Sequence, residues 1–127
     1  MQKSSLGVLT AIALFLGGCN FASSRYEYKV DCKNVDVFDF NLQGSLIKYK
    51  ITGYLEQDSE VYVQSYDEDN VQSWSGVYLK KGAVNYEDGF ETYASKGRVI
   101  YIPKRDKDQY YSRKNDKLVI QIQTAYD

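Results

Sequence analysis

The sequence predicts an all-β fold, a small antiparallel β-sandwich, and three observations support this fold class. Short segments in which apolar and polar residues alternate recur through residues 26–126. The chain has thirteen tyrosines and one proline, a composition that favours strands and argues against disorder. No segment carries an apolar stripe with the period of a helix.

Two long segments, 45–55 and 117–126, alternate most clearly, and each turns one apolar row toward the expected core. These rows are Ile47, Tyr49, Ile51 and Leu55 in the first segment, and Leu118, Ile120, Ile122 and Tyr126 in the second. Shorter strands are expected at 26–31, 35–40, 60–66, 71–79, 90–94 and 98–102, with turns at 41–44, 67–70, 80–82, 87–89 and 96–97. This spacing predicts an immunoglobulin-like or transthyretin-like sandwich, with a small closed β-barrel as the alternative.

The hairpin over residues 60–79 allows its cross-strand partners to be predicted. If its tip is a four-residue loop, Val63 faces Trp74 across the hairpin. Partners across two strands share a face, so Trp74 is expected in the core. Tyr62 and Tyr66 then lie on the opposite face, where they are available as surface contacts.

The first eighteen residues have the pattern of a secretory signal. Lys3 supplies a positive charge, and residues 6–16 form a largely apolar run that is too short to span a bilayer. The run ends in Leu16-Gly17-Gly18-Cys19, which resembles the lipobox of bacterial lipoproteins. The resemblance implies cleavage before Cys19, a diacylglyceryl group on its sulfur and acylation of the new amine.

The lipobox divides the chain into a signal peptide (1–18), an acylated anchor with a short tether (19–25) and a single β domain (26–127). Several acyl chains on one cysteine should anchor the protein permanently, whereas one chain binds only marginally. In Gram-negative lipoproteins an aspartate after the cysteine favours the inner membrane. Asn20 is not aspartate, so the resemblance favours the outer membrane, with the domain facing the periplasm.

Enzymatic chemistry finds little support in the residues present. The chain has no histidine, which excludes Ser–His–Asp and Cys–His catalysis and histidine metal ligands. Cys32 shares strand parity with Tyr28 and Val30 and is expected to be a small buried core residue, with a disulfide to a partner as the alternative. The acidic residues at 67–70 are interpreted as a solvated turn, because the spacing of a calcium loop is absent. We predict no catalytic residue, no metal and no cofactor other than the covalent lipid.

Residues 103–117 form the most unusual segment, with six basic and three acidic residues around a tyrosine pair. Tyrosine and arginine are favoured at the centres of protein contacts. The partner-binding residues predicted here are Lys104, Arg105, Tyr110, Tyr111 and Arg113. A loop lying on anionic headgroups and a merely solvated loop are the alternatives.

Residues 82–89, followed by Ser95-Lys96-Gly97, resemble part of the lipoprotein inhibitors of c-type lysozyme. Those inhibitors are small β-barrels that place a serine and a lysine into the lysozyme cleft. The resemblance implies that Lys96 would meet the catalytic carboxylates of the enzyme, and it adds Lys96 to the predicted partner-binding residues. Lys81 stands where that family has a serine, and the chain lacks the C-terminal cysteine that would pair with Cys32.

The expected function is that of a membrane-anchored envelope lipoprotein that binds another envelope protein close to the membrane. Without the signal peptide the chain carries 15 basic and 17 acidic residues, so no basic field is available for nucleic acid. One alternative is a periplasmic inhibitor of c-type lysozyme. Another is a structural or assembly lipoprotein of a secretion or mobile-element exclusion apparatus.

The anchor can be tested directly by replacing Cys19 with alanine in the full chain. We expect the variant to retain residues 1–18 and to incorporate no radioactive palmitate, because the sulfur that receives the lipid is gone. A wild-type protein that also fails to label would show that the lipoprotein interpretation is wrong.

Overall fold

Eight β-strands make up the regular structure of the described residues. The computed structural model describes residues 23–68, 70–104 and 115–126. The strands are β1 (Ser23–Lys29), β2 (Asp36–Asn41), β3 (Leu46–Leu55), β4 (Ser59–Asp67), β5 (Asn70–Leu79), β6 (Gly82–Glu91), β7 (Lys96–Pro103) and β8 (Lys117–Ala125). Across these ranges the chain forms no helix with the length and hydropathy that a membrane span requires.

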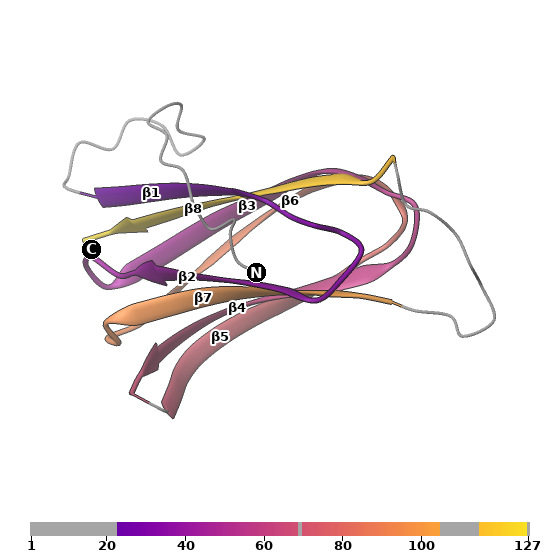
Figure 1. Cartoon of the computed structure of the whole chain (residues 1–127). Helices are drawn as coiled ribbons and strands as arrows, with labels where there is room; N and C mark the ends of the chain where they lie inside the picture. The colour runs from indigo at the N-terminus through magenta and orange to yellow at the C-terminus, as the bar shows by residue number, and fades with distance from the viewer. Residues whose placement is uncertain (1–22, 69, 105–114, 127) are drawn as a thin grey trace.

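The strands form two four-stranded antiparallel sheets that pack face to face (Figure 1). Sheet A has the order β1-β8-β3-β6, and sheet B has the order β2-β7-β4-β5. The predicted sandwich is therefore confirmed, and the closed barrel is wrong because each sheet ends in two open edges. Consecutive strands β1 and β2 lie in different sheets, as in a jelly roll built from two Greek keys, whereas the first two strands of an immunoglobulin domain pair with each other.

Alternating side chains of the central strands fill the space between the sheets. The inner row of β3 is fully buried as predicted, and so are Leu118, Ile120 and Ile122 of β8, whereas Tyr126 lies beyond the strand and is exposed. β4 and β7 contribute Val61, Val63, Val99 and Tyr101 from the opposite sheet. These strands are the inner members of their sheets, so their side chains form the centre of the core.

The β4–β5 hairpin differs from the prediction because its register shifts next to its tip. Tyr66 faces Val71, but the pairing then slips by one residue, so that Gln64, and not Val63, faces Trp74. A bulge of this kind moves every later side chain to the other face of its strand. The predicted core position of Trp74 is therefore wrong, and its side chain is 60% exposed on the outer face of sheet B.

β6 also differs from the prediction, because it runs unbroken through the expected turn at 87–89. It pairs with β3 along its whole length, from Gly82 opposite Leu55 to Glu91 opposite Leu46. Acidic residues and glycine are typical of turns, but an edge strand accommodates them because one of its sides faces solvent. No separate strand forms at 90–94, where one was expected. Residues 90 and 91 are the last two of β6, and residues 92–94 lie in the connection to β7.

The connections lie at two opposite ends of the sandwich. The N-terminal end carries the start of β1, where Ser23 pairs with Ala125, and the tip of the β4–β5 hairpin. The distal end carries the β1–β2 connection and the β5–β6 turn (Figure 1). Lys104 follows Pro103, the last residue of β7, and so lies at the distal end too. β1 starts at Ser23, three residues before the expected domain boundary, so residues 23–25 belong to the sheet and shorten the predicted tether.

Cys32 lies in the β1–β2 connection with its side chain in the core. Its side chain is 5% exposed, and its carbonyl accepts a hydrogen bond of 3.2 Å from the hydroxyl of Tyr101. The predicted burial of Cys32 is confirmed.

This burial predicts slow chemistry at the thiol. We expect Cys32 to react slowly with a maleimide in the folded protein and rapidly in urea, because the reagent cannot reach a buried sulfur. Cys32→Ser should lower the free energy of unfolding by about 1–3 kcal/mol, the scale for burying a poorly paired hydroxyl. Fast labelling of the native protein would contradict the packing of the β1–β2 connection.

Candidate functional site

The outer face of sheet A is charged. Most residues that alternate with the buried rows are exposed or half-buried, with Gln123 as a buried exception. Lys50 and Glu87 form an ion pair across β3 and β6, with a distance of 3.7 Å between Nζ and Oε2. The charged residues of this face are Arg25, Glu27, Lys29, Lys48, Lys50, Glu87, Glu91 and Lys117. Tyr54 is the aromatic exception in the described part of this face. Such a surface is typical of a sheet that faces water.

The outer face of sheet B is predominantly apolar and aromatic. Its outward side chains come from all four strands, and cross-strand partners place them in adjoining rows. We call this surface the aromatic face, and it comprises Val37, Tyr62, Tyr66, Trp74, Tyr78, Ile100 and Ile102. A contiguous exposed apolar surface marks a contact site more often than scattered apolar residues do.

A glycine on the edge strand β5 shapes the adjoining part of the aromatic face. Gly76 faces Tyr62 across β4 and β5, and a Cβ atom at this glycine would lie 2.6 Å from the Tyr62 ring. The missing side chain lets the Tyr62 ring lie over the strand, where it contacts Trp74 with ring centroids 5.9 Å apart at 57°. This tilted arrangement is one that aromatic pairs favour.

Carboxylates hold the tyrosines of the aromatic face in place. The pairs are Tyr62 with Glu60 at 2.9 Å, Tyr66 with Asp39 at 3.3 Å and Tyr78 with Asp58 at 2.7 Å, the hydroxyl donating in each case. These hydrogen bonds raise the pKa of Tyr62 and Tyr78, so both hydroxyls are neutral donors at pH 7. A surface whose side chains are already held loses less entropy when it binds.

Arg98 adds a fixed cation to the same surface. Its guanidinium carbon lies 4.4 Å from the centre of the Tyr66 ring, and its Nε donates to Oε1 of Gln64 at 2.9 Å. The ring contact is a cation–π interaction. The aromatic face thus combines tryptophan, tyrosine and arginine, the residue types that contribute most to binding at protein interfaces.

The structure separates the predicted partner-binding residues that it describes. Lys96 is exposed at the start of β7 and Lys104 is exposed just after its end, so the length of the strand, about 26 Å, lies between them. Arg105, Tyr110, Tyr111 and Arg113 lie outside the described residues, as does Cys19. Lys96 and Lys104 therefore belong to opposite ends of the sandwich and do not form one site.

The two pieces of the lysozyme-inhibitor resemblance also lie apart. Residues 82–89 belong to β6 in sheet A, whereas Lys96 starts β7 in sheet B. Ser95 donates from its backbone and from its hydroxyl to Oδ1 of Asp67, at 3.0 and 2.9 Å. The barrel fold that the resemblance implied is not the fold observed. Comparison of the sequence with protein-family models and with curated proteins gives no match.

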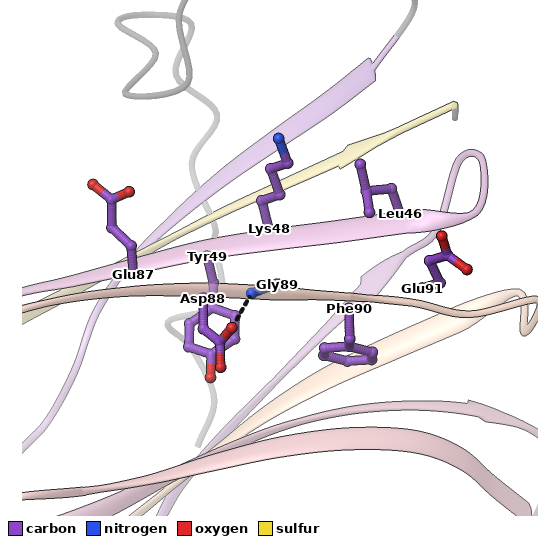
Figure 2. A pocket seen from close by; sticks show the side chains of 8 residues that line it. All are labelled: Leu46, Lys48, Tyr49, Glu87, Asp88, Gly89, Phe90 and Glu91. Atoms are coloured by element: carbon purple, nitrogen blue, oxygen red, sulfur yellow. Dashed lines mark hydrogen bonds between the residues drawn. The ribbon is translucent and has the colours of Figure 1, made fainter.

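A shallow hollow lies around the edge strand β6, but its lining does not converge on one point. Figure 2 shows Leu46, Lys48 and Glu87 on one side of the strand, with Tyr49, Asp88 and Phe90 on the other. Asp88 accepts hydrogen bonds from Ser75 at 3.1 Å and from the backbone of Gly89 at 2.8 Å. The carboxylate therefore links β6 to β5, which is a structural role.

Metal ligands do not gather in the described residues either, where no group of three or more Cys, Asp or Glu side chains could hold an ion. The aromatic face is thus the surface best suited to a function. Sequence reasoning placed Tyr62 and Tyr66 on it correctly through their alternation in β4, but missed Trp74 because a bulge has no clear sequence signal.

Asp58 lies at one edge of the aromatic face, and its ionisation makes the free energy of unfolding depend on pH. It accepts hydrogen bonds from the Tyr78 hydroxyl and from the Lys81 backbone at 2.8 Å, and these bonds lower the pKa of its carboxyl. A carboxyl whose pKa is lowered in the folded state stabilises the protein at pH values above the carboxyl's ordinary pKa.

We therefore expect Asp58→Asn to lower the free energy of unfolding at pH 7, by at most about 1 kcal/mol because the site is open to solvent. The difference from wild type should shrink below pH about 4 and vanish once the folded carboxyl is protonated. Urea unfolding of both proteins between pH 2 and pH 7 measures this difference in the free energy of unfolding. Glu91→Gln on β6 is the control, and a difference for Asp58→Asn that does not change with pH would refute the assignment.

Proposed function

We propose that this protein is a non-enzymatic lipoprotein of the bacterial cell envelope, anchored through Cys19, that binds another envelope protein through the aromatic face. The observation that carries this proposal is the contrast between the two outer surfaces of one sandwich. Sheet A presents charges to water, and sheet B presents tryptophan, tyrosine, isoleucine and valine. Exposing such a surface is an aggregation hazard unless it has a partner.

The chemistry of the aromatic face fits a protein better than nucleic acid. Trp74 and the Tyr66–Arg98 pair provide large, rigid contact groups with hydrogen-bonding groups beside them. Asp39 and Glu60 also lie on this face, where their carboxylates would repel a phosphate backbone. The face is spread over a sheet, as the contact surfaces between proteins commonly are.

The anchor would hold the domain in a defined orientation. Ser23 is four residues after Cys19, and four residues span at most about 14 Å, so the N-terminal end would lie close to the bilayer. The aromatic face extends from this end along the strands of sheet B.

Replacing Trp74 tests whether the aromatic face binds the partner protein. We expect tagged full-length protein, extracted in mild detergent, to retain one envelope protein, and Trp74→Ala to weaken its binding about thirtyfold, equivalent to about 2 kcal/mol. A large aromatic side chain that becomes buried in a contact typically contributes this much.

Two exposed aromatics outside the aromatic face provide matched controls. Tyr93 is 82% exposed in the β6–β7 connection, and Tyr54 is 48% exposed on sheet A. Tyr93→Ala and Tyr54→Ala should bind the partner normally. If both lost as much affinity as Trp74→Ala, the assignment of the binding site to the aromatic face would be refuted. Inhibition of c-type lysozyme that Lys96→Ala weakens would instead support the inhibitor alternative.

A further inference from the structure

Strand β5 is an open edge of sheet B without the usual protection against pairing. Its ten residues contain no charged side chain and no proline. Natural edge strands are generally protected by charges, prolines or bulges, because their unpaired N–H and C=O groups can accept another strand. The bulge near Ser73 disturbs only the first part of β5, and the part from Ser73 to Leu79 pairs regularly with β4.

The other three edge strands of the described sandwich are protected. Charges on β1 are Arg25, Glu27 and Lys29, those on β2 are Asp36 and Asp39, and those on β6 are Glu87, Asp88 and Glu91. Asp88 shares the inner face of β6 with Tyr49, its partner across the strands, and an inward charge of this kind is a common protection (Figure 2). The contrast singles out β5 as the edge that can pair.

Opposite charges stand at the two ends of β5. The hairpin tip before it carries Asp67 and Glu68, and the turn after it carries Lys80 and Lys81, both exposed. The nearby Lys96 at the tip and Asp58 at the turn reduce each charge without reversing its sign. An antiparallel partner with the same sequence would place each pair of lysines beside the acidic tip of the other copy.

We propose that β5 pairs antiparallel with β5 of a second copy of this chain, around a two-fold axis near Ser75. Each copy supplies the same edge, so the contact is isologous and closes as a dimer. The two B sheets then form one continuous eight-stranded sheet. The aromatic faces become continuous across the axis, because cross-strand partners share a face and Trp74 lies close to the centre of β5. Antiparallel pairing places the N-terminal ends of the two copies at opposite ends of the dimer, so both anchors can enter one bilayer when the strands lie along its surface. The pairing itself requires neither the anchor nor the partner protein.

Charge reversal at the ends of β5 tests the pairing specifically. Full-length protein in density-matched detergent should sediment as a dimer at tens of micromolar. Lys81→Glu alone and Glu68→Lys alone should each weaken the dimer at least tenfold, because each homodimer would bring like charges together twice. An equimolar mixture of the two variants should restore dimer as the heterodimer, in which both contacts are again attractive. Failure of the mixture to recover would overturn the antiparallel arrangement.

A lysine within the strand provides a second test with a matched control. Trp74→Lys introduces the charge that edge strands normally carry and should yield a monomer. Tyr93→Lys makes the same kind of change in the β6–β7 connection and should leave the dimer intact. Wild-type protein that stays monomeric at all concentrations would overturn the proposal, as would a dimer that neither Trp74→Lys nor the charge reversals affect. Capture of the envelope partner by the charge-reversal variants is measured separately, so the two proposals can fail independently.

Discussion

Burial of four central strands against one another is the constraint on which this molecule depends. β3 and β8 present rows of isoleucine, leucine and tyrosine to β4 and β7, and these rows are almost entirely removed from water. Apolar burial is the main favourable contribution to folding, so the inner strands determine where the sheets meet. The edge strands β1, β2, β5 and β6 each pair on one side only, and their outward groups are available for other contacts.

Polar side chains link the two sheets around this apolar centre. The hydroxyl of Tyr49 lies 2.7 Å from that of Ser75, and Ser75 donates to Asp88, so a chain of hydrogen bonds connects β3, β5 and β6. Burial raises the pKa of Tyr49 well above its ordinary range, so this hydroxyl is neutral. On the other side, the Tyr28 hydroxyl donates to the Asp39 carbonyl at 3.4 Å. Tyrosines thus serve both the core and the aromatic face.

The aromatic face and the open edge share one strand. β5 carries Trp74 and Tyr78 outward, and its free edge lacks charge. Charged residues on this strand would protect the edge but would also interrupt the aromatic face. A second copy that covers the edge would allow the strand to remain apolar, so pairing of the edges and exposure of the aromatic face are compatible features.

The sequence by itself determined the all-β class, most of the inner rows of β3 and β8 and the burial of Cys32. Each follows from period-two alternation, which depends only on neighbouring residues. Tertiary structure alone decided for two sheets over a closed barrel, and it alone decided the jelly-roll strand order, the continuation of β6 through an apparent turn and the outward position of Trp74. Strand order depends on contacts between distant residues, an edge strand tolerates turn-forming residues, and one bulge reverses the face of every residue beyond it. For these reasons Tyr62 could be placed on the outer surface from the sequence, whereas its neighbour Trp74 could not.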